Sequence, residues 1–307
     1  MLEFLPFTIE DKEIVQRYTS QNNYRICEYC FTDLFIWKDH YDTQRCFHDG
    51  FMFIKMQTFE EKQTMYLAPI GQGDLKQALL LLEEDAQERG IPFILCGTPE
   101  PLVEKIEEVL PDRYTFTDVE SSSDYIYLSE KMCSLSGKKL QAKRNFINRF
   151  KKTYEGRWSY EEMTAENAPE AYQFHLHWSG CDDENACPAG LMYTGETCAV
   201  SLALNHREEI GMKGGILRLD GKMIGFSMGS PVSDDTYVIQ LEKAESSVPG
   251  AYPMINQQFA LHNCTEYKYI NREDDLGIEG LRKAKHSYHP EMMGKKFMAV
   301  KKHDPIC

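Results

Sequence analysis

The spacing of apolar residues divides the chain into helices and strands, and the same order of elements occurs twice. In the first half, apolar residues three and four positions apart predict helices over residues 9–18, 30–37, 74–89 and 99–110. Short apolar runs predict strands over residues 51–54, 64–67, 92–96 and 125–128. Asp74 and Gly90 mark the clearest helix, because aspartate caps the start of a helix and glycine suits its end.

The second half repeats this order of helices, antiparallel strands and alternating elements. It has predicted helices over residues 165–178, 197–206, 251–262 and 278–285, and predicted strands over 215–219, 223–228, 237–241, 267–270 and 296–300. Asp220-Gly221 predicts a hairpin, because glycine accepts the positive φ of a tight turn. A strand–helix–strand step implies parallel neighbouring strands. We therefore predict an α/β protein (α+β, with mixed sheets) that binds ligands at the carboxyl ends of its strands.

A basic segment separates the two halves. Residues 136–154 are predicted to form a helix with seven lysines and arginines and no acidic residue among them. This helix can bind tRNA or another polyanion through phosphate contacts, or its charges can pair with the acidic surfaces of both halves. The candidates for polyanion binding are Lys138, Lys139, Lys143 and Arg144. We predict domains at 1–135 and 155–307, joined by this connecting helix, with the active site in the second domain.

The composition is that of a globular protein, with 42% hydrophobic and 27% charged residues. No apolar run approaches the roughly 18–20 residues needed to span a bilayer, and the N-terminus lacks the features of a signal peptide. We therefore expect a cytoplasmic protein without a transmembrane segment. A net charge of −14 argues against a general binder of nucleic acids or anionic membranes.

The ten cysteines are expected to be thiols, because disulfides are rare in a reducing compartment. Cys27 and Cys30 have the spacing of metal ligands, but no second pair of similar spacing follows. A local group can in principle bind zinc, and it consists of His175, His177, Cys181 and Cys187. Its spacing fits no standard zinc finger, so we predict no metal and keep a zinc enzyme as an alternative.

The element order and two stretches, Lys138–Phe150 and Tyr269–Lys285, together resemble an uncharacterised bacterial family. That family is related to the C-terminal domain of phosphatidylglycerol lysyltransferase, and the resemblance covers nearly the whole chain. It implies a tandem GNAT fold, that is, two N-acetyltransferase-like domains. It also implies transfer of an acyl or aminoacyl group to an amine or hydroxyl.

The resemblance implies two kinds of donor and no tightly bound cofactor. Aminoacyl-tRNA is the donor in the lysyltransferase branch, and acyl-CoA is the donor in ordinary GNAT enzymes. The acceptor is expected to be a small molecule or a lipid, although the chain lacks the membrane-spanning region of the lysyltransferase. The sequence indicates no oligomeric state.

Polar residues at the ends of two predicted strands are the main candidates for chemistry. Glu242 can accept a proton from an attacking amine if burial raises its pKa, and a surface ion pair with Lys243 is the alternative. After the next strand, Arg272 can hold a carboxylate or phosphate in a bidentate fork. Glu273 or Asp274 can act as a base or bind an amine, and a solvated loop is the alternative.

The flanking residues supply further candidates. Asn271 ends the strand before Arg272, and Lys283 and Lys285 lie on the helix after it, as substrate-binding residues. Tyr252 and Asn256 are one helical turn apart and can line one cleft. The alternative is that they belong to a partly buried helix face. Tyr288 is a candidate general acid by analogy with GNAT enzymes, with simple packing as the alternative.

The expected donor-phosphate loop follows the strand over 237–241. In this fold, the N–H groups of a turn and a helix N-terminus are directed at the phosphates. Ser246, Ser247 and Gly250 suit such a loop, whereas Glu245 would repel a pyrophosphate. In the first half, residues 71–73 have a Gly-Gln-Gly pattern that we interpret as a plain turn before the Asp74 cap.

The central prediction is that Glu242 and residues 271–275 form walls of one site in the second half. A non-catalytic ligand-binding or regulatory protein on the same scaffold is the alternative function, because a fold does not determine a function.

Overall fold

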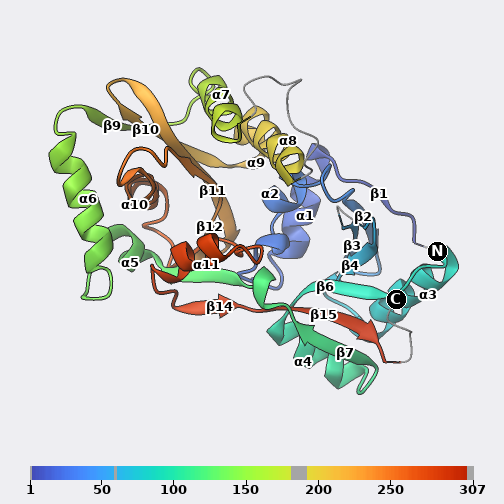
Figure 1. Cartoon of the computed structure of the whole chain (residues 1–307). Helices are drawn as coiled ribbons and strands as arrows, with labels where there is room; N and C mark the ends of the chain where they lie inside the picture. Colours follow the sequence, from blue (N-terminus) through green and yellow to red (C-terminus); the bar gives the residue numbers. More distant parts are fainter. Residues whose placement is uncertain (1, 59–60, 181–191, 303–307) are drawn as a thin grey trace.

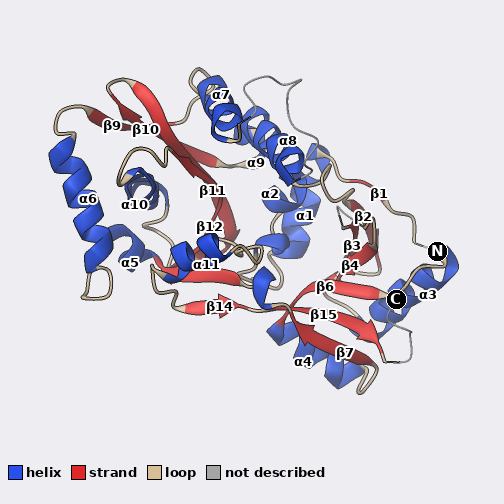
Figure 2. Ribbon diagram, viewed as in Figure 1, coloured by secondary structure: helices blue, strands red, loops and turns tan. Residues whose placement is uncertain are grey.

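The computed structural model describes residues 2–58, 61–180 and 192–302, without the side chains of residues 192–194. The described chain forms two mixed sheets with helices on their faces (Figures 1 and 2). The helices are α1 (Lys12–Thr19), α2 (Phe31–Ile36), α3 (Leu75–Arg89), α4 (Glu100–Val109), α5 (Ser129–Ser134), α6 (Gln141–Thr153), α7 (Ala168–Trp178), α8 (Met192–Asn205), α9 (Arg207–Ile210), α10 (Ala251–Asn263) and α11 (Glu279–His286), with short 3₁₀ turns η1 (Ile9–Asp11), η2 (Cys27–Tyr29) and η3 (Glu120–Ser122).

The first sheet has the strand order β1-β2-β3-β4-β6-β15-β7, with β5 paired to β3. Its strands are β1 (Leu5–Pro6), β2 (Gln44–His48), β3 (Phe51–Gln57), β4 (Thr64–Leu67), β5 (Ile70–Gly71), β6 (Ile94–Pro99), β7 (Tyr114–Asp118) and β15 (Lys296–Lys301). The β4–β6 pair is parallel across helix α3, as the strand–helix–strand order predicts.

The second sheet has the order β14-β8-β13-β12-β11-β10-β9. Its strands are β8 (Asp124–Leu128), β9 (Trp158–Glu162), β10 (Lys213–Leu219), β11 (Lys222–Ser233), β12 (Thr236–Ala244), β13 (Tyr269–Asn271) and β14 (Met292–Gly294). The β12–β13 pair is again parallel, across α10. The predicted hairpin is confirmed, because Asp220 and Gly221 both have positive φ between β10 and β11.

Both sheets are covered on two faces, which explains their continuous apolar strands. In β3, Met52 and Ile54 pack into a core shared with α1, α2, α7 and α8, whereas Phe51 and Phe53 pack into a second core under α3 and α4. The shared core contains residues of both halves, and a third core lies between the second sheet and α5, α6 and α10. The predicted α3 boundaries are confirmed, since Asp74 accepts from Gln77 N and Gly90 has φ 68°.

The two sheets exchange one strand each, which the sequence did not predict. We expected residues 125–128 to complete the first half, but β8 lies between β13 and β14 of the second sheet. Residues 296–300 were expected in the second half, but β15 lies between β6 and β7 of the first sheet (Figure 1). The partner of a strand is set by long-range contacts, which local alternation does not encode.

The predicted connecting helix is shorter than expected and begins at Gln141, after the separate helix α5. Ile147 and Phe150 of α6 are buried against the third core, and the opposite side is exposed. Across the described ranges, none of the helices combines the length and apolarity needed to cross a bilayer.

Candidate functional site

The site begins where β12 and β13 separate. β13 pairs with only the first three residues of β12, Thr236–Val238, although β12 continues to Ala244. A bulge at Gln240 shifts the register with β11. In the described chain, the second half of β12 therefore has no strand partner on the β13 side.

Glu242 and Arg272 face each other across this separation. An Arg272 Nη2 group donates to Oε1 of Glu242 at 2.8 Å, and Asn256 Nδ2 donates to Oε2 at 2.8 Å. The side chains of Arg272 and Glu242 are 14% and 10% exposed, so this is a largely buried pair. The structure thus brings together strand ends that the sequence predicted to share one site, and both Glu242 oxygens are occupied.

The chain turns sharply after β13, and Lys285 holds the turn. Glu273 has φ 56°, a conformation that is uncommon outside glycine. Lys285 is buried, and its ammonium donates to the carbonyl of Arg272 at 2.6 Å and to the carbonyl of Asp274. Burial and the Arg272 charge lower the pKa of Lys285. Lys285 therefore positions residues 272–274 through backbone contacts.

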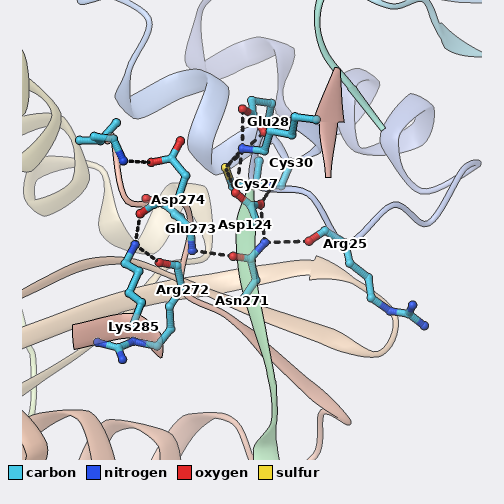
Figure 3. A network of polar contacts seen from close by, with 12 residues as sticks. Arg25, Cys27, Glu28, Cys30, Asp124, Asn271, Arg272, Glu273, Asp274 and Lys285 are labelled. Atoms are coloured by element: carbon cyan, nitrogen blue, oxygen red, sulfur yellow. Dashed lines mark hydrogen bonds and ion pairs between the residues drawn. The ribbon is translucent and has the colours of Figure 1, made fainter. Parts of the chain in front are cut away.

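Arg272 and Glu273 consequently point to different sides of the strand end (Figure 3). Glu273 lies beside helix α2, where its carboxylate meets Asp33 and the thiol of Cys27. Cys27 Sγ and one oxygen each of Asp33 and Glu273 lie within 4.8 Å of one another. Oε1 of Glu273 is buried and has no hydrogen-bond partner, and no described residue donates to the carboxylate of the buried Asp33.

We call Asp33, Glu273 and Asp274 the acidic cluster. Burial and the Glu28 carboxylate raise the pKa of Asp33 to about 8. Burial and Asp33 raise the pKa of Glu273 well above its usual range. Burial raises the pKa of Asp274 to about 6, with the nearby Asp124 carboxylate adding to the effect. The cluster therefore holds protons near neutral pH, or exchanges them for a bound cation.

A second network fixes the acidic cluster to both halves. Asp124 is fully buried and accepts from Cys27 N at 2.9 Å and from Asn271 Nδ2 at 2.6 Å (Figure 3). It also accepts from Lys296 Nζ at 2.7 Å. Lys296 also lies 2.7 Å from Glu28 and 3.3 Å from Cys27 Sγ. Asp124 and Lys296 start the two exchanged strands, so this ion pair joins the sheets.

Two groups of side chains in these networks have donor atoms close enough to share a cation. The group of Cys27, Glu28 and Asp124 has donors close enough to share a metal ion, but the Lys296 ammonium already supplies its positive charge. In the group of Cys27, Asp33 and Glu273, no lysine of the described chain pairs with either carboxylate. Asn271, predicted to bind substrate, instead donates to Asp124 and the Arg25 carbonyl and accepts from Glu273 N.

Several predicted substrate-binding residues lie elsewhere. Lys243 points to the opposite side of β12 from Glu242, where it pairs with Glu196 at 2.5 Å and lies 3.9 Å from the Trp178 ring centroid. The Tyr252 hydroxyl accepts from Trp178 Nε1 at 3.1 Å, so Tyr252 contacts the same tryptophan as Lys243. Lys283 is exposed and pairs with Glu279 within α11.

The predicted donor loop differs from a free phosphate cradle. Ser246 and Ser247 are exposed, and Gly250 caps α10 with φ 92°. A Cβ placed on Gly250 would lie 3.1 Å from Cβ of Phe150 and 3.2 Å from the carbonyl oxygen of Phe146. Helix α6 therefore lies against the α10 N-terminus, and a pyrophosphate at that turn would compete with it.

The predicted polyanion-binding residues divide into three situations. Lys138 and Lys139 are exposed. Arg144 donates to the carbonyls of Leu135 and Gly137, which closes the turn before α6. Lys143 is half-buried, with Nζ 4.1 Å from the ring centroid of Tyr288. Tyr288 is buried, which raises its pKa, and its role as a general acid stays a prediction.

The alternative zinc group is described only in part. His175 is fully buried, with Nε2 3.1 Å from Thr197 Oγ1, and burial lowers its pKa to about 4. Cys181 and Cys187 lie outside the described residues. The prediction of no metal stays untested.

The sequence analysis noted the spacing of Cys27 and Cys30 but did not predict that the first half contributes to this site. Asp33, Glu28, Cys27 and Asp124 come from that half, together with Tyr41, whose pKa is raised by burial and by Asp33. One signal was available: Asp33 interrupts the helix Phe31–Ile36, in which every residue is buried. A carboxylate inside an apolar helix is costly without a function or a partner.

Comparisons with known proteins show which protein family the sequence matches. The profile of the family described as "Phosphatidylglycerol lysyltransferase, C-terminal" matches residues 20–300. The chain spans 56% of the length of the curated relative that it matches.

Three solved structures are similar over nearly the whole chain. A conserved protein of unknown function from Bacteroides thetaiotaomicron is 39% identical, with a TM-score of 0.91 over 98% of this chain and 100% of that one. L-PGS from Bacillus licheniformis is 16% identical, with a TM-score of 0.64 over 96% and 93%. A tandem GNAT protein from the clavulanic acid biosynthesis pathway is 9% identical, with a TM-score of 0.51 over 99% and 100%. The last two comparisons show a shared fold, as the predicted tandem GNAT architecture requires.

Proposed function

Because the chain belongs to the family of the phosphatidylglycerol lysyltransferase C-terminal domain, we propose that it transfers an aminoacyl group from aminoacyl-tRNA to a hydroxyl or amine. The family and fold support the acyltransferase kind of activity. The observation that carries the choice of an aminoacyl group is the acidic cluster. Among the described residues, no group donates a hydrogen bond to the carboxylate of the buried Asp33 or to the buried Oε1 of Glu273, and these acceptors suit the ammonium group of a cationic amino acid.

Two features favour an aminoacyl donor over acyl-CoA. Helix α6 lies against the α10 N-terminus, where CoA phosphates would be expected. The Arg272–Glu242 pair occupies the separation between β12 and β13, where an extended pantetheine chain would pair with the strand edges. Both features leave the side of Glu273 and Asp274 as the place for the donor ester.

In the proposed transfer reaction, each residue of the acidic cluster has its own role. Asp33 and Glu273 bind the ammonium group, and Asp274 acts as the general base, because a pKa of about 6 leaves it largely ionised at neutral pH and still able to take a proton. The acceptor hydroxyl or amine loses its proton to Asp274 and forms a bond to the acyl carbon. The ester bond to the tRNA breaks, and the proton passes to the departing ribose oxygen. Lys285 holds the turn that carries Glu273 and Asp274, through the backbone carbonyls of Arg272 and Asp274.

The test is a transfer assay with matched donors. Purified protein is incubated with radiolabelled lysyl-tRNA or with acetyl-CoA, a mixture of phospholipids and small amines, and the label is followed into product. We expect transfer from lysyl-tRNA, none from acetyl-CoA, and a loss of at least about a hundredfold in Asp274→Asn, the size typical of a general base. Lys283→Gln is the matched control, because Lys283 is exposed on α11. Transfer from acetyl-CoA alone, or unchanged turnover in Asp274→Asn, contradicts the proposal.

A further inference from the structure

Helix α6 places one lysine over the ring of Tyr288, which Arg272 also contacts. Nζ of Lys143 lies 4.1 Å from the centroid of the Tyr288 ring, and Cζ of Arg272 lies 5.1 Å from the same centroid. Two cationic groups therefore converge on one buried aromatic side chain. They come from α6 and from the end of β13, which are more than a hundred residues apart in the sequence.

The charges at this place do not balance within the described residues. Among the described carboxylates, Glu242 is the one whose charge raises the pKa of Lys143. Its two oxygens already accept hydrogen bonds from Arg272 and Asn256. Lys143 forms no hydrogen bond or ion pair with any described side chain, and the buried Nη1 of Arg272 has no acceptor. One positive charge is left over in a half-buried position, and such a charge is costly unless a ligand of opposite sign pairs with it.

We propose that Lys143 and Arg272 form a binding site for a phosphodiester group of the substrate. A phosphodiester carries one negative charge, which equals the surplus, and its oxygens match the donors of a guanidinium and an ammonium group. The choice of a phosphodiester rests on the proposed function, because both a phospholipid acceptor and the tRNA end carry one. The site lies on the Arg272 side of the strand end, and the acidic cluster lies on the Glu273 side.

The same geometry predicts how pH acts on the site. Burial and the Arg272 charge lower the pKa of Lys143 to about 8. The charged groups that face Lys143 are Arg272 and Glu242, which pair with each other, and the Tyr288 ring, whose hydroxyl has a pKa raised by burial. Lys143 therefore loses its charge between pH 7 and pH 9, and anion binding weakens with it.

The test is calorimetric titration with two phosphodiesters, glycerophosphoglycerol and cytidylyl-adenosine, and with acetate as a carboxylate control. We expect one phosphodiester to bind at pH 7 and to bind about tenfold more weakly at pH 9, as loss of one charge with a pKa near 8 requires. Lys143→Gln should weaken binding at pH 7 by a similar factor. Lys143→Arg should retain it at pH 9, because arginine stays charged.

The matched control is Lys152→Gln, an exposed lysine on the same helix, which should leave binding unchanged. Binding of glycerophosphoglycerol identifies a lipid headgroup, and binding of cytidylyl-adenosine identifies the nucleic acid. The proposed site is overturned if acetate binds as tightly as the phosphodiesters, or if titration with millimolar phosphodiester releases no heat of binding. It is also overturned if Lys143→Gln and Lys152→Gln bind the phosphodiester with equal affinity. Binding needs no turnover, so this result is independent of the transfer assay.

Discussion

Replacing Lys296 by methionine tests the network that joins the two sheets. Lys296 is 2% exposed, Asp124 is fully buried, and their charged atoms are 2.7 Å apart. Removing one partner of a buried ion pair leaves an uncompensated charge and costs about 3–5 kcal/mol. Here the loss leaves Asp124 and Glu28 together without the shared ammonium, so we expect the Lys296→Met cost to lie in the upper part of that range.

The assay is urea unfolding at pH 7, with Lys295→Met as the matched control. Lys295 is the adjacent residue, but its side chain is 46% exposed and its closest partner, Asp118, is 3.4 Å away. Exposed pairs contribute about 0–1 kcal/mol, so the control should change stability little. Equal costs for the two variants would refute the reasoning.

Three further predictions follow from the site. Asp33→Asn should be more stable than the native chain at pH 8–9 by at least about 1 kcal/mol in thermal unfolding. The pKa of Asp33 is raised to about 8 in the folded chain, so the stability of the native chain falls as the pH rises from the unfolded-state pKa of Asp33 through about 8. The difference between the two chains should vanish near pH 4. Glu273→Gln should lower the transfer rate at least tenfold while leaving the fold intact, as judged by circular dichroism, and unchanged transfer would count against the ammonium site. Gly250→Ala should lower stability by about 1 kcal/mol or more, because φ is 92° and the new Cβ meets Phe150; Gly280→Ala is the control, since its Cβ has open space.

Local features were predictable from the sequence. The Asp220-Gly221 hairpin and the Asp74 cap depend on residues within one turn of themselves, and both are confirmed. The position of Glu242 opposite Arg272 was also predictable, because parallel neighbouring strands bring their carboxyl ends to one edge. The tandem fold followed from the repeated element order together with the resemblance.

Side-chain direction within β12 was predictable but was not used. Neighbouring residues of a strand point to opposite faces, so Glu242 and Lys243 do not line the same site. Lys243 accordingly pairs with Glu196 on the other side of the sheet.

The remaining features depend on long-range contacts. The exchange of β8 and β15 brings Asp124 to Lys296 across 172 positions, and nothing in either segment specifies its partner strand. The acidic cluster needs Asp33 of α2 to meet Glu273 after β13, so neither half alone indicates it. Asn271 has the residue type of a ligand but uses its amide to fix the Asp124 network, which requires knowing its neighbours.

The most direct measurement is the affinity of the native chain for lysine methyl ester compared with norleucine methyl ester. The two esters share the α-amine and the chain length and differ in the ε-ammonium group. If Asp33 and Glu273 bind that ammonium, lysine methyl ester should bind at least tenfold more tightly, a difference of about 1.4 kcal/mol, and Asp33→Asn together with Glu273→Gln should abolish the preference. Equal affinities for the two esters would contradict the account.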